Sequence, residues 1–183
     1  QIKIFSKENG GKHTALNLGL AHTESELVGC LDADSFVHPQ ALKRIVADFG
    51  DKEIMAVTPS VKIFEPKGFL GLVQKAEYMF GIFLRKVFSH LNALYITPGP
   101  FSVFRRSVFR QIGGYRKAHN TEDMEIAMRM QKNGMRISNV SNAFIYTVAP
   151  TTLNSLIRQS LRWVYGFIKN ALDYRDMFFK PQY

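Results

Sequence analysis

Two carboxylates follow a short apolar run near the start of the chain. Residues 27–31 read LVGCL, and Asp32, Ala33 and Asp34 come directly after them. Such a run is typical of a buried parallel strand, and side chains two apart in an extended chain point the same way. Two carboxylates at the carboxyl end of a strand suit Mg²⁺ or Mn²⁺ with phosphate oxygens. An acidic turn before the next helix explains the pair equally well.

A glycine-rich turn precedes the first helix. Residues 2–5 are predicted to form a strand, Gly10, Gly11 and Lys12 follow, and apolar residues between 15 and 21 give the next helix a face to bury. Such a turn can hold a phosphate because its backbone approaches closely and its N–H groups are free. It is not a P-loop, since Ser6 and His13 occupy positions where that motif requires Gly and Ser or Thr. A flexible surface turn is the alternative.

A second acidic pair, Glu122 and Asp123, stands at the start of a predicted helix. Carboxylates are favoured in a first turn by the helix dipole, so capping alone accounts for this pair. Upstream, Gly99 and Pro100 belong to a stiff, open turn, which is useful where a ligand must pass the backbone and is also common in plain loops.

The last predicted helix spans about residues 152–174. One apolar stripe runs along it, made of Leu153, Ile157, Leu161, Val164, Ile168 and Leu172. Away from that stripe, Gln159, Arg162 and Trp163 project from neighbouring positions. An indole can stack on a sugar and a guanidinium can bind phosphate oxygens. The tryptophan could equally anchor the helix on the core or at a membrane interface.

Composition places these motifs in one globular domain of 183 residues, with strands and helices alternating as in a parallel α/β sheet. The formal net charge of +9 indicates an anionic partner, but no nucleic-acid motif accompanies it. The single cysteine, Cys30, excludes an internal disulfide framework. The longest apolar segment, residues 69–84, is interrupted by charges and is not expected to span a bilayer.

Taken together, the motifs and their order resemble the processive, inverting family 2 glycosyltransferases, the group of cellulose, chitin, hyaluronan and poly-N-acetylglucosamine synthases. The resemblance spans nearly the whole chain. The matching segments are Gly10-Gly11-Lys12 before residues 15–17, Asp32-Ala33-Asp34, Gly99-Pro100, Thr121-Glu122-Asp123 and Gln159-Ser160-Leu161-Arg162-Trp163.

The resemblance implies a role for each position on the donor side. Asp34, helped by Asp32, would hold the divalent metal, Mg²⁺ or Mn²⁺, that bridges the diphosphate of a UDP-sugar. Lys12, with Gly11 in the same turn, would meet the nucleotide or its phosphates.

On the acceptor side, the resemblance implies that Asp123 is the general base that takes the proton from the acceptor hydroxyl, with Glu122 supporting its loop. Gly99 and Pro100 would line the acceptor path.

The final motif is implied to serve both substrates. Gln159, Arg162 and Trp163 would cover the diphosphate and the terminal sugar of the growing glycan. Ser160 departs from the family, which usually has Gln or Arg at this position. This difference counts against a processive enzyme.

The implied fold is α/β of the GT-A type, a Rossmann-like, mostly parallel sheet with flanking helices, incomplete at its N-terminus. Residues 1–150 would form the catalytic core without its first nucleotide-binding strand. Residues 151–183 would form the amphipathic helix leading towards a membrane segment outside this chain, at the cytoplasmic face of the cell membrane. Both ends are therefore expected to continue in a longer protein, with this fragment inactive alone.

The implied activity is transfer of a sugar from a UDP-sugar to a growing β-linked polysaccharide, with no nucleic-acid partner. The alternatives are a non-processive transferase acting on a lipid or small acceptor and a nucleotide-sugar-binding module without transfer activity. The sugar and the linkage stay open.

Overall fold

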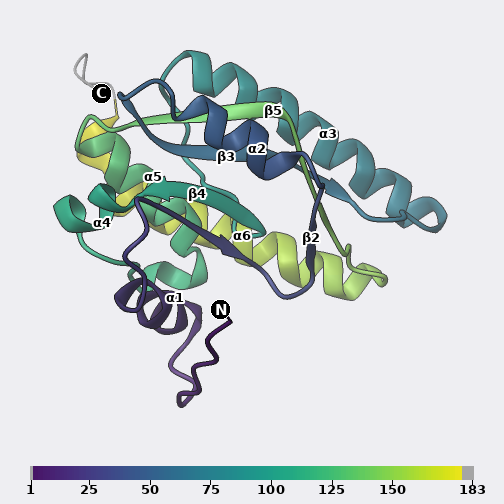
Figure 1. The fold of residues 1–183 in the computed structure, drawn as a ribbon. Coiled ribbons are helices and arrows are strands. Elements are labelled where there is room, and N and C mark those ends of the chain that lie inside the picture. Colours follow the sequence, from purple (N-terminus) through teal and green to yellow (C-terminus); the bar gives the residue numbers. More distant parts are fainter. Residues whose placement is uncertain (1, 179–183) are drawn as a thin grey trace.

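The computed structural model describes residues 2–178 and has a five-stranded sheet with helices on both faces (Figure 1). The strand order across the sheet is β1-β4-β3-β5-β2. The strands are β1 (Leu27–Leu31), β2 (Ser35–Val37), β3 (Ile54–Ile63), β4 (Phe101–Arg105) and β5 (Arg136–Thr147).

The sheet is mixed in direction. Strands β1, β3 and β5 run the same way, as a parallel α/β sheet requires, but β4 lies between β1 and β3 and pairs antiparallel with both. At the far edge, β2 is antiparallel to β5, so β3 and β5 are the only directly paired parallel strands among the described residues. Hydrophobic patterns identify strands without giving their direction, which explains why a mostly parallel sheet was expected.

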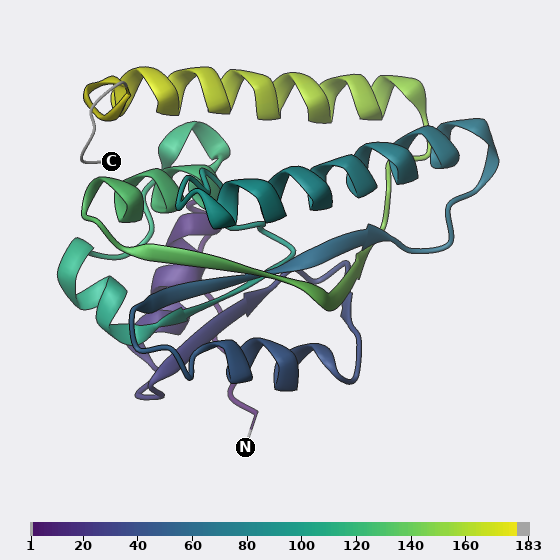
Figure 2. The ribbon, with the colours of Figure 1, turned by 90° about the horizontal axis from the view of Figure 1, so that it is seen from above.

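The helices form layers around this sheet. Figure 2 shows α2 on one face, α3 and α5 on the other, and α6 outside α5. The helices are α1 (Lys12–Ala21), α2 (Ala41–Asp48), α3 (Gly68–His90), α4 (Arg106–Ile112), α5 (Glu122–Lys132) and α6 (Leu153–Asp173), with short 3-10 helices η1 (Ala118–Asn120) and η2 (Arg175–Met177).

Each face of the sheet contributes to its own core cluster. Between the sheet and α5, the buried residues include Phe104, Ile126 and Ile137. Between the sheet and α2, they include Ile45 and Ile145. Burial of apolar side chains on both faces fixes the positions of the strand ends, which carry the candidate site.

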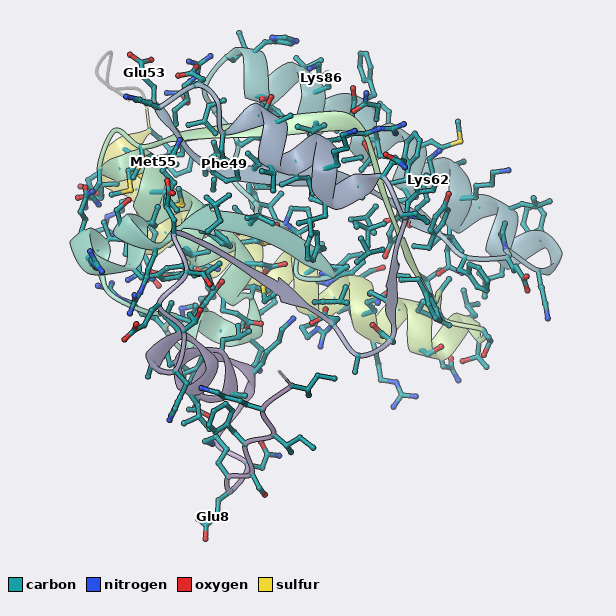
Figure 3. All side chains as sticks on the ribbon, in the orientation of Figure 1. Glu8, Phe49, Glu53, Met55, Lys62 and Lys86 are labelled. Carbon is teal, nitrogen blue, oxygen red and sulfur yellow. The ribbon has the colours of Figure 1, made fainter. Side chains whose placement is uncertain are left out.

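Two local predictions were wrong. Residues 2–5 form no strand, and the side chains of Ile2 and Ile4 are 95% and 92% exposed, because no strand in the described part of the chain lies beside them. Figure 3 shows this segment, with Glu8, extending away from the sheet. Strand β1 is an edge strand and not a buried one, since β4 is its only partner in the described part of the chain and Leu31 is 49% exposed. Strand β5 is continuous over residues 136–147, and its register against β3 shifts between Pro59 and Ser60.

Helix α6 turns its apolar stripe away from the protein. The predicted stripe residues Leu153, Ile157, Leu161, Val164, Ile168 and Leu172 are all between 46% and 62% exposed. The opposite face, which includes the buried Gly166 and Asn170, packs on η1 and α5. Within residues 2–178, no helix combines the length and the apolarity required to cross a bilayer.

A buried ion pair fastens α5 to its neighbours. Arg129 donates to the Glu125 carboxylate at 3.0 Å and to the carbonyls of Ile112 at 2.6 Å and Gly114 at 2.8 Å. Tyr174, just after α6, donates its hydroxyl to the other Glu125 oxygen at 2.5 Å. Both charged residues are only 4% exposed, so each depends on the other to offset its desolvation.

We predict that Arg129→Met lowers the free energy of unfolding by about 3 kcal/mol, because it leaves the buried Glu125 carboxylate with only the more exposed Arg116, at 3.7 Å, as a counter-charge. The matched control is Arg136→Met, which removes an exposed pair with Asp51 and is expected to cost about 1 kcal/mol or less. Urea unfolding measures both, and equal losses for the two variants would contradict the structural role of the buried pair.

Candidate active site

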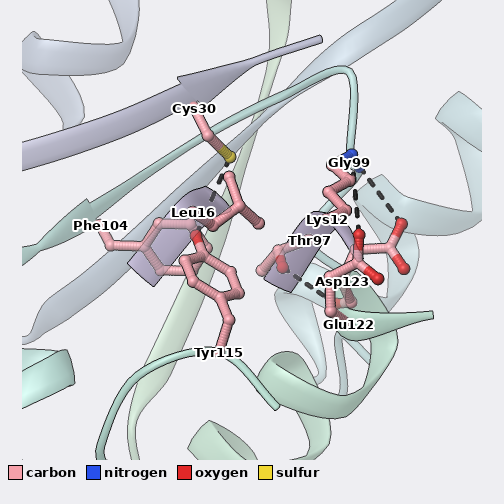
Figure 4. A pocket seen from close by; sticks show the side chains of 9 residues that line it. All are labelled: Lys12, Leu16, Cys30, Thr97, Gly99, Phe104, Tyr115, Glu122 and Asp123. Carbon is pink, nitrogen blue, oxygen red and sulfur yellow. Dashed lines mark hydrogen bonds and ion pairs between the residues drawn. The ribbon is translucent and has the colours of Figure 1, made fainter. Parts of the chain in front are cut away.

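Three segments that are distant in sequence bring charged groups together beside the turn that precedes β4. The ammonium of Lys12 lies 2.6 Å from an Asp32 carboxylate oxygen and 3.7 Å from a Glu122 oxygen. Asp123 follows Glu122 in the first turn of α5 and accepts a hydrogen bond at 3.2 Å from the Gly99 amide. Figure 4 shows Lys12, Gly99, Glu122 and Asp123 around this point.

Gly99 is the position at which these groups meet. A methyl group built on its Cα would lie 3.1 Å from Lys12 Nζ, 3.4 Å from Asp123 Oδ2 and 3.6 Å from Asp32 Oδ2. The carbonyl of the next residue, Pro100, accepts a hydrogen bond from the Asp32 amide at 3.2 Å. The Gly99–Pro100 turn therefore joins the acidic end of β1 to the start of α5.

The Asp123 carboxylate is held entirely by backbone amides. Gly99 donates to Oδ2, and Met124 donates to Oδ1 at 3.0 Å. The carbonyl of Asp123 accepts from the amide and the hydroxyl of Thr97, at 3.0 Å and 2.9 Å. Burial and the neighbouring Glu122 charge raise the pKa of Asp123 to about 6, against the opposing effects of Lys12 and the two amides. A carboxylate tuned in this way suits general base catalysis near neutral pH.

Lys12 begins α1, directly after the turn predicted to hold a phosphate. Burial opposes the charged form of Lys12, but its contact with Asp32 and the charge of Glu122 outweigh that effect and raise its pKa. Gly11 has a φ of 91°, which favours glycine, and its amide donates to Asn9 Oδ1 at 3.0 Å. Lys12 therefore faces the acidic cluster, whereas the Gly11 N–H is already occupied by its own turn.

A small cavity lies beneath the cluster. Its volume is about 10 Å³, enough for about one water molecule. The lining residues are Lys12, Leu16, Cys30, Thr97, Gly99, Phe104, Tyr115, Glu122 and Asp123. A ligand of the size of a nucleotide sugar must therefore bind on the open side, where the side chains of Lys12 and Asp32 are 39% and 30% exposed.

Asp34 is not brought to this cluster. The Ser35 amide donates to the Asp32 carbonyl at 3.0 Å, so the chain turns at residues 33 and 34 and is not extended as predicted. Asp34 is exposed and accepts a hydrogen bond from the Ser35 hydroxyl at 3.2 Å. Among the described residues, no three acidic, histidine or cysteine side chains gather into a site for a metal ion. Two carboxylates on one turn nevertheless fit a hard cation that receives its remaining oxygen ligands from phosphates and water.

The three residues predicted on α6 do not line the cavity either. Gln159 and Trp163 are partly buried on the inner side of the helix, and Arg162 is exposed. Gly166, one turn after Trp163, packs against Thr121, the residue before Glu122 and Asp123. Through Gly166 and Thr121, the structure therefore connects α6 to the segment that carries the acidic pair.

Sequence reasoning missed several residues that shape the site. Cys30 lies two positions before Asp32, and this spacing on a strand was the signal that both face the same side. The Tyr115 hydroxyl lies 3.9 Å from Cys30 Sγ, and the backbone N–H and C=O of Tyr115 are both bound by Asn17 at 2.8 Å. No local pattern identifies Tyr115 or Thr97, because folding alone brings them to the site.

Comparison with known proteins gives a family match over most of the chain. Residues 27–182 match the family model described as Glycosyl transferase family group 2. The chain is 30% identical over 168 residues to the poly-beta-1,6-N-acetyl-D-glucosamine synthase of Staphylococcus aureus strain COL, covering 90% of this chain and 40% of that protein. The Staphylococcus epidermidis protein of the same name is 29% identical over 86% of this chain and 39% of its own length.

Solved structures support the fold. The mannosyltransferase PcManGT from Pyrobaculum calidifontis, in complex with GDP-Man and Mn²⁺, has a TM-score of 0.75 at 22% identity, over 96% of this chain and 47% of its own. S. aureus TarS 1-349 in complex with UDP-GlcNAc has a TM-score of 0.58 at 17% identity, over 83% and 43% of the two chains. The predicted GT-A type of α/β fold is thereby confirmed.

The chain spans about 40% of the length of the curated relatives that it matches. The family model covers most of the chain, from β1 to beyond the end of α6, and includes Asp32, Gly99, Asp123 and Trp163. This chain therefore belongs to glycosyl transferase family group 2.

Proposed function

We propose that the protein transfers a sugar, with inversion, from a UDP-sugar to the end of a growing β-linked polysaccharide. The observation that carries this proposal is the Asp123 carboxylate, held by two backbone amides beside Lys12 and Asp32, with its pKa raised to about 6. The names of the matched synthases support N-acetylglucosamine as the transferred sugar.

Asp123 is proposed to act on the acceptor. Each of its carboxylate oxygens accepts one backbone hydrogen bond and retains a lone pair for the acceptor hydroxyl. Removing that proton makes the oxygen nucleophilic enough to displace the nucleoside diphosphate in one step from the opposite side of the anomeric carbon. A single displacement inverts that carbon and requires no protein nucleophile.

Lys12 and Arg162 are proposed to act on the donor. The leaving diphosphate gains negative charge as the glycosidic bond breaks, and cationic side chains placed beside it stabilise the transition state more than the ground state. Lys12 already lies at the cluster, while Arg162 has an exposed guanidinium suited to bidentate phosphate binding. Gly11 would contribute through the turn that orients Lys12, while Gln159 lies one turn before both Arg162 and Trp163.

Asp34 and Asp32 are the residues proposed to hold Mg²⁺ or Mn²⁺. The solved complex of PcManGT with GDP-Man and Mn²⁺ supports a divalent ion in this fold. When bound, such an ion neutralises the diphosphate and so assists its departure.

The acceptor is proposed to approach along Gly99 and Pro100, with its terminal sugar stacked on Trp163. Glu122 supports this loop through its ion pair with Lys12. In the absence of a side chain, Gly99 leaves room for a ligand close to Asp123.

The exposed apolar residues of α3 and α6 support a membrane-associated location, proposed to be the cytoplasmic face of the cell membrane. On α3, Phe69, Phe80 and Phe83 are 83%, 61% and 61% exposed, in addition to the outward stripe of α6. Exposed apolar surface of this extent is typical of sites that contact a membrane or other protein segments.

Asp123→Asn in the full-length protein is expected to lower kcat by about 10²–10⁴-fold, because the amide cannot accept the acceptor proton. Affinity for the UDP-sugar should stay unchanged, since the base acts on the acceptor. Initial rates with radiolabelled donor and calorimetric donor binding measure the two effects. The control is Asp51→Asn, in the turn between α2 and β3, and a loss of donor binding in Asp123→Asn would contradict the proposed role.

The raised pKa of Asp123 predicts a pH-dependent effect on stability. Its pKa is 3.8 when unperturbed and about 6 in the fold, so the folded state loses stability as the pH rises between these values. Asp123→Asn should therefore stabilise the metal-free chain by about 1–2 kcal/mol more at pH 8 than at pH 4. Urea unfolding in EDTA at both pH values measures this difference, and an equal effect at the two pH values would refute the raised pKa.

Asp34→Asn is expected to abolish the part of UDP binding that depends on Mn²⁺, because it removes one of two carboxylates proposed as metal ligands. Calorimetric titration of UDP with Mn²⁺ and with EDTA separates this part from the rest, and Asp48→Asn on α2 serves as the control. Identical Mn²⁺-dependent binding in Asp34→Asn and the unmodified protein would exclude Asp34 from the metal site.

A further inference from the structure

The inner face of α6 carries two amide side chains, one indole and one glycine. Gln159, Trp163, Gly166 and Asn170 follow one another at steps of four, three and four, which places them on one face of the helix. Gly166 and Asn170 are buried, whereas Gln159 and Trp163 are partly exposed. Contact with the rest of the protein is therefore concentrated at Gly166 and Asn170, towards the C-terminal half of α6.

Gly166 is packed directly on the side chain of Thr121. A methyl group built on Gly166 would lie 2.3 Å from Thr121 Cγ2, 2.4 Å from Oγ1 and 2.8 Å from Cβ. A glycine inside a helix costs about 1 kcal/mol relative to alanine, so this close approach is the physical reason for glycine here. Any larger residue must move α6, Thr121 or both.

Asn170 holds the same side chain by a hydrogen bond. Its amide Nδ2 donates to Thr121 Oγ1 at 2.8 Å, and that hydroxyl in turn donates to the Ala118 carbonyl at 3.0 Å. Asn170 is fully buried and Thr121 is 2% exposed. The hydrogen bond is therefore shielded from water and requires one specific position of α6 along its axis.

Thr121 is the residue directly before Glu122 and Asp123. It is the N-cap of α5, and its carbonyl accepts from the amides of Met124 and Glu125 at 3.1 Å. The Thr121 side chain, which Gly166 and Asn170 of α6 contact, therefore belongs to the same short segment that positions the proposed catalytic base.

We propose that Thr121, Gly166 and Asn170 are positioning residues that fix the register of α6 over the start of α5, and so set where Trp163 and Arg162 lie relative to Asp123. This proposal rests on the proposed function, which assigns Trp163, Arg162 and Asp123 their roles. Trp163 lies three residues before Gly166, a rise of about 4.5 Å along the same rigid helix. A shift at Gly166 is therefore transmitted to the indole.

Gly166→Ala is the principal test, with Gly19→Ala as its matched control. Gly19 also lies inside a helix, α1, but a methyl group there would have no described atom within 4 Å apart from its own helix backbone and chain neighbours. Trp163 is the only tryptophan of the chain, so its fluorescence reports on α6 directly. For Gly166→Ala we expect a shift of the emission maximum and altered acrylamide quenching, with neither change in Gly19→Ala.

In the full-length protein, Gly166→Ala should lower kcat/KM for transfer by about 10- to 100-fold, as expected when groups that bind substrate are displaced by about 1 Å. A purely structural defect would reduce the amount of active protein, and so the apparent kcat, without changing KM for the donor. We expect KM to rise as well. Unchanged KM and unchanged Trp163 emission in folded Gly166→Ala would overturn the proposal.

Two further variants keep the test decisive if Gly166→Ala does not fold. Asn170→Ala removes only the hydrogen bond and should give a smaller change of the same kind. Thr121→Ala removes two of the three Thr121 atoms that the new methyl group of Gly166→Ala would meet. The decrease in log kcat/KM of the double variant should therefore be smaller than the sum of the decreases of the two single variants. Additive decreases in log kcat/KM for these two substitutions would contradict the proposed contact. An Asn170→Ala variant with the same Trp163 emission and the same KM as the unmodified protein would contradict it as well.

The two proposals fail differently. Absence of transfer in the unmodified full-length protein with every nucleotide sugar would count against the proposed function, while the fluorescence comparison of Gly166→Ala with Gly19→Ala would still decide the packing at Thr121. Normal transfer with equal emission and KM in these two variants would leave the function standing and overturn the positioning role.

Discussion

The site depends on holding like charges close together at the place where three chain segments meet. Asp32, Glu122 and Asp123 would repel one another, and the Lys12 ammonium offsets this by contacting the first two. The Gly99 and Met124 amides hold the third carboxylate, and burial and the Glu122 charge keep its pKa raised against the opposing effect of these hydrogen bonds. In the proposed function, the divalent ion would replace Lys12 as the partner of Asp32, and the Lys12 ammonium would then be available to pair with the diphosphate.

Much of this arrangement could be predicted from the sequence. The order of short motifs indicated the fold and the residues Lys12, Asp32, Gly99 and Asp123, which do converge. The side-chain direction of Asp34 could not be predicted, because the chain turns directly after Asp32. Thr97 and Tyr115 carry no local signal, since only tertiary packing brings them to the cavity.

Helix α6 shows a second limit of sequence patterns. Its apolar stripe was found correctly, yet the protein is contacted by the opposite face, at Gly166 and Asn170. An amphipathic pattern identifies two faces of a helix without showing which one the rest of the chain covers. Here the close approach of a glycine and one buried hydrogen bond determine the packing, and the apolar face stays exposed.

The most direct test of this account is the pKa of the Asp123 carboxyl group, measured by carbon-13 NMR titration in the metal-free chain. The account predicts a value near 6, and a further rise in Lys12→Met, because the Lys12 charge lowers that pKa. A titration near the ordinary value of 3.8 that Lys12→Met leaves unchanged would show that the groups do not share one site and would contradict the account.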